Sequence, residues 1–256
     1  MNENRQIYES KRVVQNYKEK TKLFPAENIL LDLVLARKEN KSMLDLGVGT
    51  GRTTGFFAKH FDNYLGIDIS SQMIEVCKQR FTGAENTEFI ISDAASLPQL
   101  PRKQFDLIFF SFNGIDCLKN LDERIALLGT IHGLLSENGL FAFSSHNTLA
   151  VYRLYSFQLP RRNPFKLITE YYHYVKLRKV NGPVSNFIDK NFFQIYDGCE
   201  YFKARYGYIL PSYQVNLLEQ SGFKNIQAVD MNGKNIPLSE IDSCNDNWIH
   251  YFCYKN

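Results

Sequence analysis

The chain has 256 residues and a formal net charge of +3, and 44% of its residues are hydrophobic. This length suits one large α/β domain or one domain with an insertion, and the apolar fraction is ordinary for a globular protein. The charge balance is too small to indicate nucleic-acid binding by itself. No apolar stretch approaches the roughly 18–20 residues that a membrane span needs.

The start of the chain and its cysteines predict a cytoplasmic protein. Residues 1–20 are polar and charged and lack the apolar region of a signal peptide. The five cysteines are scattered and form no C-x-x-C pair. This pattern indicates reduced thiols and neither a disulfide framework nor a zinc site, so no metal is predicted.

Helical and strand patterns alternate through the first part of the chain. The predicted strands are residues 42–46, 63–68, 87–91, 105–110 and 140–145, the last preceded by a turn at 137–139. The predicted helices are residues 25–38, 50–61, 70–81 and 121–135. The last helix has Ile125, Leu128, Ile131 and Leu135 at helical spacing. This alternation predicts right-handed crossovers and an open parallel sheet.

The alternation stops after residue 147 and resumes near residue 211. Residues between these points are rich in aromatic and basic side chains, and segments 191–196 and 199–205 around Asp197-Gly198 predict a β-hairpin. A helix is then predicted from Pro211 to Gly222, followed by strands at 224–230 and 248–254.

Three glycines alternate directly after the first predicted strand, which ends in Asp45-Leu46. Glycine allows the backbone to bend sharply and lets a ligand approach the bare main chain. The spacing is G-x-G-x-G, and Arg52 stands where the dinucleotide fingerprint requires a small residue. This departure argues against NAD or FAD.

The segment from Asp45 to Gly51, Asp-Leu-Gly-Val-Gly-Thr-Gly, resembles motif I of the class I S-adenosylmethionine (SAM)-dependent methyltransferases. The resemblance extends over about residues 17–147 and, more weakly, from 211 to the end. It implies a Rossmann-like, mostly parallel seven-stranded sheet with helices on both faces and an antiparallel last strand. The implied parts are an N-terminal helical cap (1–40), a SAM-binding core (41–147), an inserted aromatic-rich substrate lid with a β-hairpin (148–210) and a C-terminal part of the core sheet (211–256).

The resemblance also implies a SAM site at the carboxyl ends of the first four strands. Glycines would approach the methionine part, acids would meet its ammonium group, the ribose hydroxyls and the adenine amine, and apolar residues would flank the adenine and the sulfonium. The implied SAM-binding residues are Tyr17, Asp45, Gly47, Gly49, Gly51, Arg52, Asp68, Ile69, Met73, Asp93, Ala94, Phe110 and Ser111.

Several of these residues have a simpler interpretation. The glycines and Asp45 also suit a purely structural turn, and Asp68 also suits a helix N-cap. Arg52 either meets the SAM carboxylate or lies along its helix. Tyr17 either closes over SAM or packs in the core.

Two polar clusters follow the fourth and fifth predicted strands, where open α/β sheets bind ligands. His146 is the candidate catalytic base, since imidazole titrates near neutral pH, and its alternative is a wall residue without proton transfer. Asn113 is the candidate residue that orients the acceptor, and its alternative is an Asx turn in its own loop. Basic residues of the insertion either attract an anionic acceptor group or form a solvated face. They are Arg161, Arg162, Lys166, Lys176, Arg178 and Lys179.

The predicted function is therefore a SAM-dependent methyltransferase acting by in-line displacement on an oxygen or nitrogen of a small organic acceptor, with S-adenosylhomocysteine as product. The chain has no Asp/Asn-Pro-Pro-Tyr/Phe run after the fourth strand and no Pro-Cys dipeptide, which disfavours nucleic-acid bases. The alternatives are an RNA or protein methyltransferase, a non-catalytic SAM-binding protein and a nicotinamide-dependent oxidoreductase.

Overall fold

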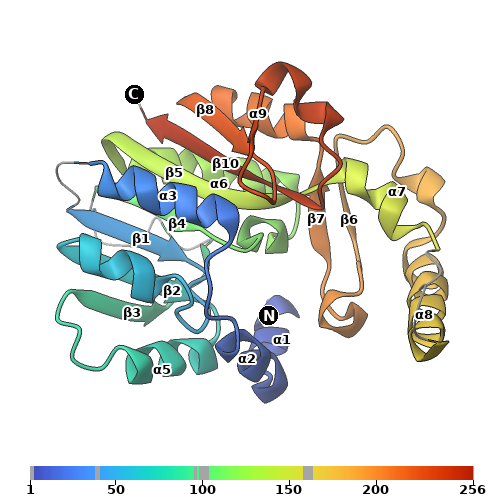
Figure 1. The fold of residues 1–256 in the computed structure, drawn as a ribbon, viewed down its shortest axis with the longest axis horizontal. Coiled ribbons are helices and arrows are strands. Elements are labelled where there is room, and N and C mark those ends of the chain that lie inside the picture. The colour runs from blue at the N-terminus through green and yellow to red at the C-terminus, as the bar shows by residue number, and fades with distance from the viewer. Residues whose placement is uncertain (1–2, 38–40, 95–96, 98–103, 158–163, 256) are drawn as a thin grey trace.

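The computed structural model describes all residues except 1–2, 38–40, 95–96, 98–103, 158–163 and 256 (Figure 1). The predicted anion-attracting residues Arg161 and Arg162 therefore lie outside the described residues, as does the side chain of Lys166. None of the helices within the described residues has the length and apolar character that a membrane crossing requires.

A ten-stranded sheet forms the centre of the molecule, with the order β3-β2-β1-β4-β5-β10-β8-β9. Strand β7 also pairs with β5, and β6 pairs with β7. The strands are β1 (Ser42–Leu46), β2 (Asn63–Asp68), β3 (Thr87–Ile91), β4 (Phe105–Phe110), β5 (Leu135–Asn147), β6 (Phe192–Ile195), β7 (Tyr206–Ile209), β8 (Phe223–Val229), β9 (Asn235–Ile236) and β10 (Trp248–Lys255). The α/β architecture is confirmed, but the sheet has ten strands instead of seven, because the hairpin and β9 join the seven-stranded path.

The first four strands coincide with their predicted bounds and run parallel, and β10 is antiparallel to both neighbours, as predicted. Strand order reverses at β1, because β2 lies on one side of it and β4 on the other. In an open α/β sheet this switch point opens a crevice at the carboxyl ends of the strands.

Helices cover both faces of the sheet (Figure 1). The α-helices are α1 (Glu3–Tyr8), α2 (Lys11–Lys18), α3 (Pro25–Leu35), α4 (Thr54–Phe57), α5 (Ser71–Arg80), α6 (Leu121–Leu134), α7 (Val151–Leu154), α8 (Pro164–Asn181) and α9 (Pro211–Gln220). Short 3₁₀ helices are η1 (Ala58–His60), η3 (Gly114–Cys117), η4 (Thr148–Ala150), η5 (Val184–Asn186), η6 (Cys199–Phe202) and η7 (Leu238–Ser243).

Neighbouring residues of each core strand point to opposite faces, so the sheet has a hydrophobic core on each side. Leu44 and Ile108 pack on the face covered by α6 and α9, whereas Met43 and Leu107 pack on the face covered by α3, α4 and α5. Local signals set the helix starts. Ser70 is the N-cap of α5, because its side chain accepts a hydrogen bond from the main-chain N–H of Met73.

Three predicted elements differ from the structure. The helix predicted from residue 50 begins only at Thr54, because the glycine turn continues through Gly51, whose φ is +77°. The predicted turn at 137–139 lies within the long strand β5, where Asn138 adopts a φ of +60° and the pairing with β4 shifts register. The hairpin exists, but its second strand is Tyr206–Ile209 and not 199–205, because Glu200, Tyr201 and Phe202 are left-handed.

The N-terminal helices pack across the carboxyl end of β2, and the inserted segment forms a cluster of its own (Figure 1). Val13 and Val14 of α2 pack against Met73 and Val76 of α5. In the insertion, Val151, Tyr155, Leu177 and residues of β6 and β7 form a separate small core. The crevice at the strand ends is therefore bounded by the N-terminal helices and by the β6–β7 hairpin.

Candidate active site

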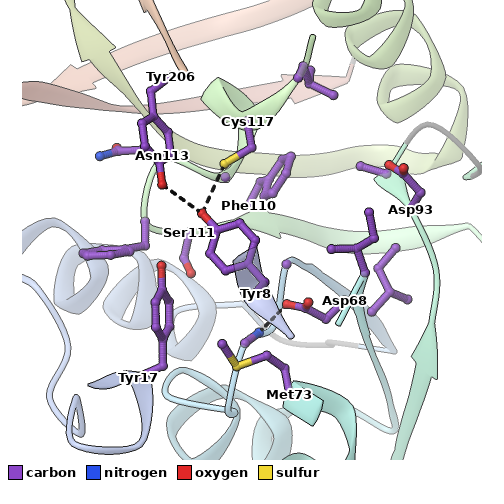
Figure 2. A pocket seen from close by; sticks show the side chains of 18 of the residues that line it. Tyr8, Tyr17, Asp68, Met73, Asp93, Phe110, Ser111, Asn113, Cys117 and Tyr206 are labelled. Atoms are coloured by element: carbon purple, nitrogen blue, oxygen red, sulfur yellow. Dashed lines mark hydrogen bonds between the residues drawn. The ribbon is translucent and has the colours of Figure 1, made fainter. Parts of the chain in front are cut away.

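A cavity of about 340 Å³ opens at the carboxyl ends of the core strands (Figure 2). This volume falls in the range of small-molecule sites. Its walls come from the N-terminal helices, the glycine turn, the ends of β2 to β5 and the hairpin loop. Of the predicted site residues, it is lined by Tyr17, Gly47, Gly49, Asp68, Ile69, Met73, Asp93, Ala94, Phe110, Ser111, Asn113 and His146.

The glycine turn contributes bare main chain to this cavity. Gly47 and Gly49 have φ values of +64° and +56°, a region that only glycine adopts without strain. A Cβ atom on Gly47 would lie 3.1 Å from Cε2 of Phe110, and one on Gly49 would lie 3.5 Å from Cδ1 of Tyr17. The two glycines therefore keep open the space that a ligand needs beside the turn.

Gly51 has a different role from its two neighbours. It does not line the cavity, and a Cβ atom there would lie 2.5 Å from Cε2 of Phe81. Its lack of a side chain allows the turn to pack against the end of α5.

Asp68 ends β2 and joins the glycine turn to the start of α5. Its Oδ2 accepts a 2.9 Å hydrogen bond from the main-chain N–H of Gly49 (Figure 2). Its Oδ1 accepts a 2.8 Å hydrogen bond from the main-chain N–H of Ser70. Burial raises the pKa of Asp68 to about 6, although these hydrogen bonds favour the charged form. Asp68 is thus a fixed carboxylate at the cavity wall that is ionised at neutral pH.

The structure does not bring Asp45 or Arg52 to the cavity. Asp45 is fully buried behind the turn, where its Oδ2 accepts hydrogen bonds from Thr53 and Tyr64, and burial raises its pKa to about 6. The guanidinium of Arg52 forms a two-pronged ion pair with Glu27 of α3, at 2.5 and 2.6 Å. A charge bound in this way is not available to a ligand carboxylate.

The N-terminal helices close one side of the cavity with Tyr8, Tyr17 and Lys20. The Tyr8 hydroxyl lies 3.3 Å from the Tyr206 hydroxyl and 3.6 Å from Sγ of Cys117 (Figure 2). Tyr17 was predicted as a site residue and Tyr8 was not, because Tyr8 follows a polar segment without any motif. Among the described residues of the insertion, those that line the cavity are Cys199, Glu200 and Tyr206.

The loop after β4 adopts a strained conformation at the cavity wall. Phe112 and Asn113 both have positive φ, at 53° and 59°. Such non-glycine residues cost free energy and occur where the surroundings hold them, often at functional sites. Here the main-chain N–H of Asn113 donates a 2.8 Å hydrogen bond to Oγ of Ser144 on β5. The conformation directs the Asn113 side chain toward the end of β5.

Asn113 and His146, predicted separately from two strand ends, are in contact. Nδ2 of Asn113 lies 3.2 Å from Nε2 of His146, and Oδ1 of Asn113 has no hydrogen-bond partner among the described residues. The His146 ring stacks on Tyr208 with ring centroids 4.8 Å apart. An imidazole and an amide with a free acceptor atom therefore share the cavity with the glycine turn and Asp68. The described residues contain no group of three or more His, Cys, Asp and Glu side chains placed to hold a metal ion.

Comparison with known proteins identifies the fold and a methyltransferase domain within the chain. A family described as a methyltransferase domain matches residues 43–139, which run from β1 to the start of β5. The chain has a class I SAM-dependent methyltransferase domain. The methyltransferase domain thus includes the glycine turn, Asp68 and the loop that holds Asn113, whereas His146 lies just beyond the matched residues.

Two curated relatives align with this domain. The chain is 30% identical over 124 residues to a malonyl-[acyl-carrier protein] O-methyltransferase of Marinomonas sp., covering 46% of this chain and 44% of the relative. It is 34% identical over 89 residues to a demethylmenaquinone methyltransferase of Clavibacter sepedonicus, covering 34% and 36%. The alignments span less than half the length of either relative.

The solved structures are similar over most of the chain. A SAM-dependent methyltransferase of Mesorhizobium loti superposes with a TM-score of 0.64 at 18% identity, covering 90% of this chain and 98% of that one. At this identity the likeness concerns the fold. The fold of most of the chain is therefore that of a known architecture.

Proposed function

We propose that the cavity binds SAM and that the protein transfers its methyl group to a hydroxyl oxygen or an amine nitrogen of a small organic acceptor, leaving S-adenosylhomocysteine. The observation that carries this proposal is the position of the Asn113–His146 pair in the same cavity as the glycine turn and Asp68. The family match supports the cofactor, and the polar pair supports the chemistry.

The residues present fit the cofactor at three points. Gly47 and Gly49 bring bare main chain to the cavity wall, where the amino-acid part would lie. Asp68 uses two of the roughly four acceptor positions of a carboxylate for Gly49 and Ser70, which leaves positions for ribose hydroxyls. Ile69 and Met73 would flank the adenine, and Asp93 with Ala94 at the end of β3 would meet its edge.

Bound SAM supplies a methyl group on a positively charged sulfur, which is already electrophilic. The protein must therefore hold the acceptor in line, exclude water and, where the acceptor is neutral, take its proton. Tyr8, Phe112 and Trp248 line the same cavity as His146 and supply apolar surface around the acceptor position. Nε2 of His146 would accept the proton once the acceptor displaces the Asn113 amide nitrogen, which lies 3.2 Å from it.

A carboxyl acceptor is the second candidate, because one relative is named a malonyl-[acyl-carrier protein] O-methyltransferase. A carboxylate is ionised at neutral pH and needs no base. The histidine beside the cavity therefore favours an acceptor that must lose a proton, such as an alcohol, a phenol or a protonated amine. RNA and protein acceptors and a non-catalytic SAM-binding role are further outcomes that the experiment separates.

The test is transfer of a labelled methyl group from SAM into a fractionated cell extract, with identification of the product by mass. We expect label in a small-molecule fraction and loss of at least about 100-fold in rate with His146→Gln, in line with the usual contribution of a general base. Label in RNA or protein, or a rate unaffected by His146→Gln, would contradict the proposed chemistry. Binding of SAM without any transfer would indicate a non-catalytic protein.

A further inference from the structure

Asp116 lies directly behind His146 at the centre of a buried hydrogen-bond cluster. It belongs to η3 and is 1% exposed. Its Oδ1 accepts hydrogen bonds from Oγ of Ser145, at 2.7 Å, and from Nη2 of Arg124. Its Oδ2 accepts a 2.7 Å hydrogen bond from the main-chain N–H of His146. The carboxylate therefore has donors on both oxygens and cannot rotate away from β5.

Arg124 gives this carboxylate its countercharge. It lies on α6 and is 1% exposed, and its Nη1 donates to Oε1 of Gln214, at 2.5 Å, and to Oγ of Ser145, at 3.1 Å. A guanidinium keeps its charge in proteins, and a buried one needs an anion beside it. Arg124 is thus the buried ionic partner of Asp116.

The ring of His146 lies beside this charge, with its Nδ1 buried and in none of the hydrogen bonds formed by the described residues. Its Nδ1 lies 2.8 Å from Oδ2 of Asp116. Two lone pairs at this distance would repel each other, so the neutral imidazole carries its proton on Nδ1 and its lone pair on Nε2. The amide of Asn113 is compatible with this form, because its Nδ2 can donate to Nε2 over 3.2 Å.

We propose that Asp116, held in place by Arg124, is a positioning residue that keeps neutral His146 in the Nδ1-protonated form. The catalytic meaning of this inference rests on the proposed function. With the proton on Nδ1, the nitrogen that remains to accept a proton is Nε2, which lies beside Asn113. Neither Asp116 nor Arg124 lines the cavity. Both would act on the acceptor through the imidazole. In histidine sites generally, the hydrogen-bond partner of one ring nitrogen decides whether the other nitrogen carries a proton.

The test is the ¹⁵N NMR spectrum of histidine-labelled protein at pH 8.5, where ordinary imidazole is neutral. His146→Gln assigns the signals of His146 among the five histidines. We expect the Nδ1-protonated form in the native sequence and a shift toward the Nε2-protonated form in Asp116→Asn, whose amide can donate to Nδ1. The Nε2-protonated form in the native sequence, or an unchanged spectrum in folded Asp116→Asn, would overturn the proposal.

A matched control is Asp106→Asn. Asp106 lies on β4, and its Oδ2 accepts hydrogen bonds from the main-chain N–H groups of Lys41 and Ser42 at the opposite end of the sheet. This variant should leave the His146 signals unchanged. If Asp116→Asn does not fold, the double variant with Arg124→Gln removes both buried charges. If neither variant folds, the protonated nitrogen of His146 in the native protein decides the test: a proton on Nδ1 supports the proposal, and a proton on Nε2 overturns it.

Calorimetry and turnover separate this proposal from the proposed function. We expect folded Asp116→Asn to bind SAM within about twofold of the native affinity and to lose about 100- to 1000-fold in kcat, within the range that general bases contribute. Absence of SAM binding in the native protein would refute the proposed function but leave the NMR result valid. Native turnover in folded Asp116→Asn would refute only the positioning role.

Discussion

The main-chain N–H of Gly49 and the carboxylate of Asp68 are joined by a 2.9 Å hydrogen bond. This bond links the turn after β1 to the end of the neighbouring strand β2, two points separated by the whole of α4. Because Gly49 needs a left-handed backbone to make it, the turn and the acid form one unit. A ligand that contacts both would meet a preorganised surface.

The first prediction concerns the contribution of Asp68 to cofactor affinity. Asp68→Ala removes an ionised acceptor, and hydrogen bonds to charged groups contribute about 1.5–3 kcal/mol. We expect SAM binding to weaken by about 10- to 150-fold in isothermal titration calorimetry. The control is Asp62→Ala, which removes an exposed aspartate before β2 and should leave affinity unchanged. Unchanged affinity in Asp68→Ala would exclude a role in holding the ribose.

The second prediction concerns pH. Burial raises the pKa of Asp68 to about 6, so the carboxylate that would hold the ribose protonates as the pH falls through 6. We expect SAM affinity to fall by up to about tenfold per pH unit below 6 and to be level above 7. Titrations between pH 5 and 8 test this, and Asp68→Asn should remove this part of the pH dependence. The same fall in Asp68→Asn would assign it to another group.

The stability of the fold depends on pH in the opposite direction from the affinity for SAM. A carboxyl group whose pKa is higher in the folded than in the unfolded state binds its proton more tightly when folded. Asp68 and Asp45, both with pKa values of about 6, therefore lower the free energy of unfolding as the pH rises from about 4 to 6. Affinity for SAM should rise over the same interval in which these two groups reduce stability.

The sequence predicted the sheet best where each strand is an apolar run between clear turn signals. Strands β1 to β4 have their predicted bounds for this reason. The second strand of the hairpin was wrong, because residues 199–205 contain three consecutive left-handed residues that local propensity does not encode. Tertiary packing of the η6 loop sets that conformation.

The candidate site was predictable where it follows strand ends and not where it depends on packing between distant segments. Asn113 and His146 each follow a predicted strand, whereas Tyr8 reaches the cavity only because α1 docks there. Helix α6 shows the same limit. Its apolar spacing predicted Ile125 as an inward residue, but Ile125 is 41% exposed, and the buried neighbour is Arg124, which pairs with Asp116.

The third prediction separates backbone strain from steric overlap at two left-handed glycines. A Cβ atom on Gly51 would lie 2.5 Å from the Phe81 ring, whereas one on Gly83 meets nothing within 4 Å. Gly83→Ala should cost only the strain of a left-handed residue, about 1–2 kcal/mol. Gly51→Ala should lower the free energy of unfolding by about 1–3 kcal/mol more, because it overpacks the contact.

Urea unfolding of the two variants tests this difference. Adding Phe81→Leu to Gly51→Ala should recover part of the loss, because a smaller side chain leaves room for the new methyl group. Equal costs in Gly51→Ala and Gly83→Ala would show that the Phe81 ring moves aside freely and that only backbone strain matters.

The fourth prediction concerns the attachment of the N-terminal helices that carry Tyr8 and Tyr17. Between α1 and α2, the Glu9 carboxylate accepts hydrogen bonds from the main-chain N–H and the hydroxyl of Ser71, at 2.9 and 3.0 Å. Ser70 adds a 2.9 Å hydrogen bond from its hydroxyl to the main-chain oxygen of Tyr8. An anion at the first turn of α5 is also favoured by the helix dipole.

Glu9→Ala should therefore loosen the attachment without damaging the core, at a cost of about 0.5–2 kcal/mol, as for a lost N-cap contact. Because local opening is governed by local free energy, amide hydrogen exchange in residues 3–20 should accelerate by about 2- to 30-fold, while exchange in β1 and β4 stays unchanged. Glu19→Ala is the matched control, since Glu19 is exposed on the same segment and its side chain accepts a hydrogen bond from Gln15.

If SAM binds beneath these helices, its addition should slow the exchange in native protein more than in Glu9→Ala. Equal exchange in the native protein and Glu9→Ala would mean that apolar packing of Val13 and Val14 on α5 alone holds the N-terminal helices in place.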